Sequence, residues 1–167
     1  MMSEQKKSLH EFYEMTIKHV MQPWESQTHC VTEDDTVARV FSLLKNQDHL
    51  WVTDRKNEKQ LAGIITQSDM IALISPPLTS LQTFDKPDIR SLQFGIGMTA
   101  GEIMSKKPVT AHPDESIKNI LLTMREQRIK QILIVDERNQ PIGEITLGHL
   151  IKEYSKYSAQ NLEIQQP

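Results

Sequence analysis

The sequence has few of the features that indicate a secreted, membrane-spanning or metal-binding protein. Its 167 residues include a single cysteine, Cys30. One cysteine excludes an intrachain disulfide and a multi-cysteine zinc site, and it fits a reducing compartment, so we expect the cytoplasm. No apolar run approaches the roughly 20 residues that a membrane helix needs. The first residues are polar and contain no apolar signal core, so we expect neither secretion nor a membrane partner.

The chain also lacks an excess of positive charge. It has 19 Lys and Arg residues against 22 Asp and Glu residues, a formal net charge of −3, and the basic residues are scattered. Binding to a phosphate backbone requires clustered positive charge, so nucleic acid is not an expected partner. With 38% hydrophobic and 25% charged residues, the composition is that of an ordinary soluble folded protein.

What the sequence does contain is an internal repeat with a period of about 80 residues. Residues 63–66 (GIIT) return as residues 143–146 (GEIT), and a set of four apolar residues also returns. The four lie at i, i+3, i+4 and i+7, the spacing that places them on one face of an α-helix. They are Val37, Val40, Phe41 and Leu44 in the first copy, and Ile117, Ile120, Leu121 and Met124 in the second. This self-similarity predicts a duplicated structural unit.

Each copy predicts the same order of elements, β-α-β-β-α. Asp34 and Asp114 are the expected N-caps of the first helix in each copy, because their carboxylates can accept hydrogen bonds from the first helical turn. Runs of β-branched and aromatic residues follow each helix and predict strands. The expected segments are residues 35–46 and 115–127 for these helices, 50–53 and 131–135 for the strands, and positions near 67 and 147 for the start of the second helices.

These elements predict an α+β fold with two repeats. One unit leaves one face of its sheet bare, so two units are expected to pair with pseudo-twofold symmetry, with a cleft on each side. The expected parts are an N-terminal amphipathic helix (1–19), a first repeat (20–75), an inter-repeat linker that packs on the core (76–99), a second repeat (100–156) and a polar tail (157–167) whose last residues fray.

In this order, the elements resemble the paired CBS (cystathionine-β-synthase) domains, also called the Bateman module. The resemblance rests on Val20 and Met21 returning as Ile103 and Met104, on a strand ending at Asp136, and on the two Gly-x-Ile-Thr segments. It implies a free-standing regulatory module, not an enzyme, that binds an adenosine-containing ligand between its repeats and signals to a partner protein that the sequence does not name. AMP, ADP or ATP are the first expected ligands, and S-adenosylmethionine or NAD follow. It also implies a homodimer.

The family motif assigns the ligand site in the first copy. In a Gly-hydrophobic-x-Thr-x-x-Asp segment, the threonine lies near phosphate and the aspartate binds the ribose hydroxyls. Residues 63–69 match this motif fully, so the resemblance assigns these roles to Thr66 and Asp69. A carboxylate can accept from two vicinal hydroxyls. The residues themselves leave a second interpretation open, in which Thr66 and Asp69 form a capping box and bind no ligand.

The second copy departs from this motif, since His149 stands three residues after Thr146 in place of the aspartate. An imidazole can bond one hydroxyl but has no pair of anionic oxygens. We therefore expect one competent site and a second site that is weak, empty or differently specific. This departure also keeps an alternative function open, a ligand-free dimerisation or docking module.

Other ligand contacts follow from the resemblance by position alone. His29, Cys30 and Val31 are expected beside the adenine ring, with Ile65 as a wall. Arg128 and Lys130 are candidate phosphate-binding cations, although the residues alone are more typical of a solvated surface, and Asp48 stands at the corresponding position of the first copy. Trp51 is expected to be a core residue rather than a stacking platform. The histidines show no metal-binding spacing, so no metal site is expected.

Overall fold

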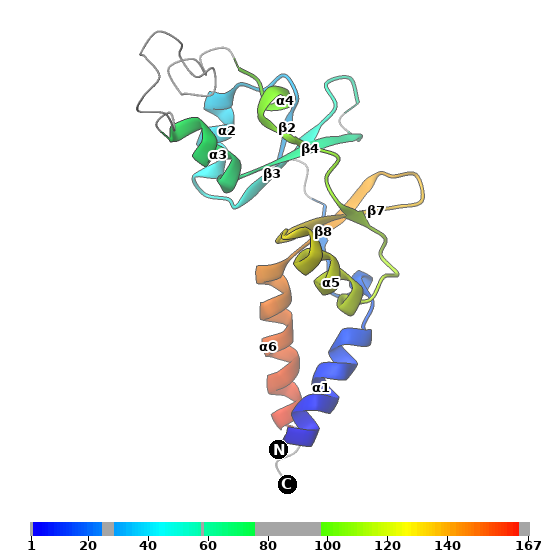
Figure 1. The fold of residues 1–167 in the computed structure, drawn as a ribbon. Helices are drawn as coiled ribbons and strands as arrows, with labels where there is room; N and C mark the ends of the chain where they lie inside the picture. The colour runs from blue at the N-terminus through cyan, green and yellow to red at the C-terminus, as the bar shows by residue number, and fades with distance from the viewer. Residues whose placement is uncertain (1, 25–28, 58, 76–97, 164–167) are drawn as a thin grey trace. The chain divides into compact units, whose positions relative to one another are not determined.

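The computed structural model describes residues 2–24, 29–57, 59–75 and 98–163 (Figure 1). They belong to two compact units, each with its own sheet and helices, which confirms the expected α+β class. We call Met1–Trp24 together with Val109–Pro167 the terminal unit, and Glu25–Pro108 the central unit. The expected inter-repeat linker lies almost entirely outside the described residues, so its packing stays a prediction.

The central unit contains the first β-α-β-β-α repeat. Its four-stranded sheet has the order β2-β3-β4-β5, with β2 parallel to β3 and the other neighbours antiparallel. Apolar side chains of the sheet and of α2 and α3 form its core. The elements are β2 (Cys30–Thr32), α2 (Val37–Leu44), β3 (His49–Thr53), β4 (Leu61–Thr66), α3 (Gln67–Ile74), α4 (Ala100–Ile103) and β5 (Ser105–Lys106).

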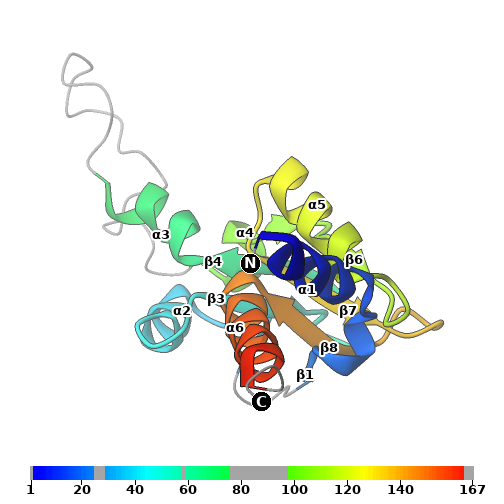
Figure 2. The ribbon, with the colours of Figure 1, turned by 90° about the horizontal axis from the view of Figure 1, so that it is seen from below.

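The terminal unit contains the second repeat and the N-terminal helix. Its sheet has the order β1-β8-β7-β6, again with one parallel pair, β6 and β7. Helices α1 and α6 lie side by side in both ribbon views (Figure 1, Figure 2). The elements are α1 (Met2–Glu14), the 3-10 helix η1 (Ile17–His19), β1 (Gln22–Pro23), β6 (Thr110–Ala111), α5 (Ile117–Gln127), β7 (Gln131–Val135), β8 (Pro141–Thr146) and α6 (Leu147–Glu163).

Each sheet ends in a strand that comes from the start of the other repeat. Strand β1 lies at the start of the first repeat but pairs with β8, and β5 lies at the start of the second repeat but pairs with β4. The two registers are equivalent, because Gln22 lies opposite Glu144 and Ser105 lies opposite Ile64. The compact units therefore interleave the sequence repeats and do not coincide with residues 20–75 and 100–156.

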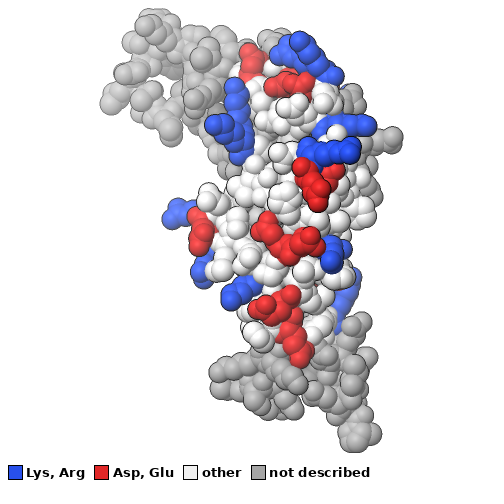
Figure 3. Space-filling model, turned by 90° about the vertical axis from the view of Figure 1, so that its right-hand side faces the viewer, with Lys and Arg blue, Asp and Glu red and all other residues white. Residues whose placement is uncertain are grey.

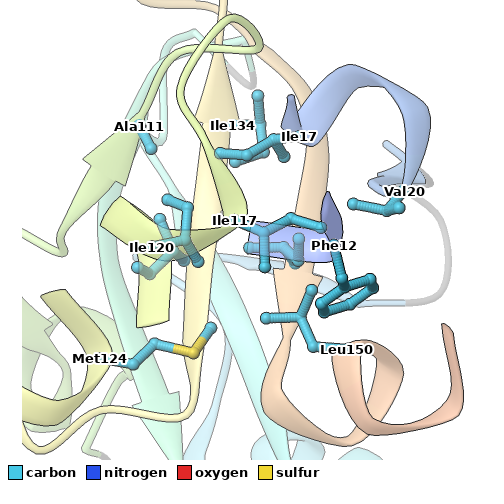
Figure 4. Close-up of a cluster of buried hydrophobic side chains, with 11 residues drawn as sticks. Phe12, Ile17, Val20, Ala111, Ile117, Ile120, Met124, Ile134 and Leu150 are labelled. Atoms are coloured by element: carbon cyan, nitrogen blue, oxygen red, sulfur yellow. The ribbon is translucent and has the colours of Figure 1, made fainter. Parts of the chain in front are cut away.

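The core of the terminal unit explains why the N-terminal segment stays with the second repeat. Phe12, Ile17 and Val20 pack beside Ile117 of α5 and Leu150 of α6 (Figure 4). Phe12 also makes an edge-to-face contact with the ring of Tyr154 at 5.2 Å between centroids. Burial of these side chains contributes about 1.5–3 kcal/mol each, so the α1 segment is an integral part of this unit.

The helical boundaries at both ends of the chain differ from the sequence prediction. The expected helix over residues 1–19 ends at Glu14, because the following chain becomes extended and the amide of Ile17 donates to the carbonyl of Glu115 at 2.9 Å. The expected polar tail from residue 157 is helical as far as Glu163. Tyr157 donates to the carboxylate of Glu11 at 2.9 Å, and this tertiary contact stabilises the extra turns.

The expected aspartate N-caps are also corrected by the structure. Helix α2 is capped by Thr36, whose hydroxyl accepts from the amide of Arg39 at 3.3 Å, and α5 is capped in the same way by Ser116. Asp34 and Asp114 instead form ion pairs with Arg55 and Lys18. The acidic residue that follows each of them bonds to the turn before the helix. Asp35 accepts from the amide of Thr32 at 2.8 Å. The acidic stretch therefore shapes the turn, and the hydroxyl begins the helix.

These two caps give a direct prediction. Thr36→Ala and Ser116→Ala should each lower the free energy of unfolding by about 1 kcal/mol, because an amide of the first turn loses its acceptor. Urea denaturation followed by circular dichroism measures the change. Asp34→Ala is the matched control and should cost less, and an equal or larger loss in that variant would restore Asp34 as the cap.

Candidate functional site

The candidate site in the central unit is built at the junction of β4 and α3. The strand delivers Thr66 in extended conformation, and the helix begins at the next residue and brings Asp69 back toward it. Asp69 Oδ2 accepts from the amide of Thr66 at 2.7 Å and from its hydroxyl at 2.9 Å. The capping box considered from the sequence is therefore present. Among the described residues, no donor contacts the other carboxylate oxygen, Oδ1.

The start of β3 lies directly beside this junction. His49 is the register partner of Thr66 across the sheet, and the amide of Gln67 donates to the carbonyl of Asp48 at 3.1 Å. The buried His49 ring makes edge-to-face contacts with the rings of His29, at 6.1 Å, and Trp51, at 5.3 Å between centroids. The site thus joins a carboxylate, a hydroxyl and a row of nitrogen-containing aromatic rings.

The structure sorts the other first-copy residues into two groups. Val31 and Ile65 are buried members of the apolar core, so their side chains belong to the packing under α2 and α3. His29 and Cys30 are half-buried at the start of β2. Trp51 is fully buried, as expected of a core residue. No ligand role was predicted for His49, and its only signal was its position directly before the strand predicted over residues 50–53.

The equivalent junction in the terminal unit has different chemistry. Thr146 precedes α6, and its hydroxyl accepts from the amide of His149 at 3.1 Å, so the helix keeps its cap. The His149 ring does not turn back toward Thr146 as Asp69 does toward Thr66. Its Nε2 lies 2.8 Å from the backbone carbonyl oxygen of Val20. The second copy therefore keeps the helix cap, but the side chain at the last motif position, His149, contacts Val20 instead of the motif threonine.

The charged residues of the terminal unit singled out by the motif lie on α6 and in the segment between α5 and β7. Lys156 donates to Glu153 at 2.6 Å and, with His149 nearby, lowers the pKa of the Glu153 carboxyl. Lys130 is exposed, and its carbonyl accepts from the amide of Leu147 at 2.8 Å. Lys130 thus takes the position in the terminal unit that Asp48 takes in the central unit. Arg128 is also exposed and ends α5 in a left-handed conformation. Both cations lie in the terminal unit, so any role at Asp69 stays a prediction.

The glycine that opens each motif has a steric reason to be glycine. A Cβ at Gly63 would lie 2.8 Å from the carbonyl oxygen of Ser105, and one at Gly143 would lie 2.7 Å from that of Gln22. These contacts are shorter than packed atoms tolerate, because the edge strands β5 and β1 pair with β4 and β8 at the two glycines. The motif glycine is thus explained by the exchanged strands rather than by a ligand.

The described residues offer few alternatives to this site. Within them, no group of three or more His, Cys, Asp or Glu side chains is placed to hold a metal ion. No described helix is both long and apolar enough to cross a membrane. On the face in Figure 3, the described Lys and Arg side chains are interspersed with Asp and Glu side chains.

Comparison with protein families gives two matches to one model. The CBS domain model matches residues 17–76 and again residues 100–156. An uncharacterized protein of Methanocaldococcus jannaschii is 25% identical over 139 residues, which span 73% of this chain and 83% of that protein. A homoserine O-acetyltransferase of Methanosphaera stadtmanae is 24% identical over 125 residues, but the matched region spans only 21% of that enzyme.

Solved structures agree in fold along most of the chain. The CBS domain of a bacterial CNNM/CorC family Mg²⁺ transporter in complex with ATP has a TM-score of 0.67 at 17% identity, covering 92% of this chain and 96% of that one. The CBS-pair protein CBSX2 of Arabidopsis thaliana has a TM-score of 0.65 at 21% identity, covering 86% and 96%. CBSX2 has also been solved in complex with AMP. With its two matched segments, the chain belongs to the CBS-domain family and carries the domain twice.

Proposed function

We propose that the protein is a regulatory module that binds one adenine nucleotide, AMP, ADP or ATP, beside Thr66 and Asp69 of the central unit. The observation that carries the proposal is the Asp69 carboxylate. It is half-buried at a helix start, holds Thr66 through Oδ2, and leaves Oδ1 without a donor among the described residues. A vicinal diol supplies hydroxyl donors for such a carboxylate.

The neighbouring groups suit the rest of a nucleotide. The half-buried His29 and Cys30 lie at the start of β2, where an adenine ring would find both apolar surface and backbone polar groups. His49 beside Thr66 adds a ring whose nitrogen atoms can form hydrogen bonds. Two structures of similar fold were solved with ATP and with AMP, which supports the choice of ligand class.

Calorimetric titration tests this function. We expect AMP, ADP or ATP to bind with one nucleotide per chain, with S-adenosylmethionine and NAD as weaker competitors. A thermal shift should accompany binding, because a ligand that binds only the folded state raises its stability. Absence of heat and of a thermal shift with all five compounds would contradict the proposal. The proposal assigns no catalytic step to the chain and places it in the cytoplasm, where it would report nucleotide levels to a partner protein.

A second candidate function, a dimerisation module, is favoured by one specific observation. Ile71 of α3 and Ile151 of α6 occupy equivalent positions of the two repeats and are 59% and 58% exposed. Ile74, one turn after Ile71, is 57% exposed, and neighbouring exposed apolar side chains that form a patch are typical of interaction surfaces. We propose that the chain forms a homodimer through these helices, alone or together with nucleotide binding.

The dimer gives its own prediction. Light scattering coupled to gel filtration should show twice the mass of the chain, and Ile151→Asp should return it to the monomer mass, because a buried carboxylate opposes association. Lys152→Asp, at the adjacent exposed residue, is the matched control and should stay dimeric. A monomer in the wild-type protein at high concentration would exclude this function.

A further inference from the structure

We propose that His149 is a positioning residue that binds the N-terminal segment, residues 15–23, to the start of α6. It occupies the motif position that Asp69 occupies in the first repeat, and it donates a hydrogen bond to the protein's own backbone. The second repeat has thereby turned a ligand-facing position into part of its fold.

The His149 side chain contacts the backbone of the N-terminal segment. His149 Nε2 lies 2.8 Å from the carbonyl oxygen of Val20, across 129 positions of sequence. A carbonyl oxygen can only accept, so Nε2 must carry the proton. The backbone amide of the same residue donates to Thr146 at 3.1 Å. His149 therefore bonds both to the helix start and to the segment that leads into β1.

The first repeat has an aspartate, Asp69, at the position of His149. Ile103 is the counterpart of Val20, because the edge strands that follow these residues pair with β4 and β8 in equivalent registers. The counterpart of His149 is Asp69, whose ionised carboxylate accepts and cannot donate to a carbonyl. Asp69 bonds to Thr66 instead, whereas the terminal unit has a side-chain donor, His149, on the carbonyl of Val20.

The surrounding charges favour the required proton on Nε2. Glu153 Oε1 lies 3.9 Å from Nε2 and also accepts from Lys156 at 2.6 Å. The Lys156 ammonium lowers the pKa of Glu153 and so keeps it ionised. A carboxylate beside Nε2 attracts a proton to that nitrogen. The side chains of Glu153 and Lys156 thus support donation by His149 to Val20.

Besides its apolar packing, the segment that His149 holds is attached by backbone hydrogen bonds to residues 115–117 and to β8. The amide of Ile17 donates to the carbonyl of Glu115, and the amide of Ile117 donates to that of Met15, both at 2.9 Å. Strand β1 then adds two residues to the edge of the sheet. His149 supplies the polar link from this segment to α6, where a two-residue strand alone gives little stability.

Hydrogen exchange measured by mass spectrometry tests the proposal on the full chain without nucleotide. His149→Gln keeps an NH donor at a distance from Cα similar to that of Nε2, while His149→Asn is equally polar but too short. We expect peptides covering residues 15–23 to exchange about 5-fold to 10-fold faster in the Asn variant than in wild type, as the loss of one hydrogen bond predicts. The Gln variant should stay near wild type.

Two results would overturn the role of His149. Equal exchange in the Gln and Asn variants would show that donation to Val20 does not hold the segment. Wild-type exchange in a third variant, His149→Ala, would show that the side chain is dispensable. If the Ala variant fails to fold, the comparison of Gln with Asn still decides. Because no nucleotide is added, the outcome is separate from whether Asp69 binds one.

Discussion

Asp69→Asn is expected to weaken binding of AMP by about 100-fold, which corresponds to the loss of two charge-assisted hydrogen bonds to a diol. The asparagine side-chain oxygen can still accept from the amide of Thr66, so the cap of α3 should persist. Asparagine offers one acceptor oxygen where aspartate offers two. Calorimetry measures the affinity for AMP. Thermal denaturation without nucleotide measures the stability that the cap contributes.

Two controls separate binding from folding in this experiment. Asp69→Ala removes the cap as well, so it should lower both the affinity and, by about 1 kcal/mol, the stability of the nucleotide-free protein. His149→Gln changes the equivalent position of the second repeat and should leave the affinity unchanged. Undiminished binding by the Asn and Ala variants would show that the ligand binds elsewhere, and the capping box alone would then explain Thr66 and Asp69.

Gly63→Val and Gly143→Val should each destabilise the fold by about 2–3 kcal/mol, the usual cost of forcing a side chain into a packed site. In both cases the new atoms collide with the backbone of the edge strand, 2.8 Å away at Ser105 and 2.7 Å away at Gln22. A backbone carbonyl that belongs to a sheet cannot move aside as a flexible side chain can. The midpoint of thermal unfolding should fall by about 6–10 °C.

Gly148→Ala is the matched control for these two variants. Gly148 lies near the start of α6, and no atom lies within 4 Å of the position that its Cβ would take. This substitution should raise stability by about 0.5–1 kcal/mol, because alanine loses less backbone entropy in a helix. If Gly63→Val unfolds at the wild-type temperature, the close approach of the β5 backbone to Gly63 is wrong.

The local elements of the fold were predictable from the sequence because they depend on near neighbours. The i, i+3, i+4, i+7 stripe beginning at Val37 places α2 within two residues of its observed ends, and the β-branched run at residues 131–135 matches β7. The N-caps were predicted at the wrong residues. An acidic side chain just before a hydroxyl can serve either the preceding turn or the helix. Only the folded structure shows that Asp35 bonds to the turn and that Thr36 caps the helix.

The candidate site was predicted in part for the same reason. Thr66 and Asp69 are three residues apart on a helix start, so their contact is local and was foreseen as one of two interpretations. The partner of His149 was not foreseen, because Val20 lies 129 positions away. The place of His49 beside Thr66 depends on the register of β3 with β4, which the pattern of residues 49–66 does not specify.

The sequence by itself determined the duplication, the order β-α-β-β-α in each copy, and the asymmetry between Asp69 and His149. These properties follow from residue identity and short-range periodicity. Only the tertiary structure decided that β1 and β5 are exchanged between the repeats, that the motif glycines make room for them, and that His149 bonds to Val20. The physical reason is that hydrogen-bond partners and steric contacts depend on distance in space, and the chain brings distant segments together only when its sheets form.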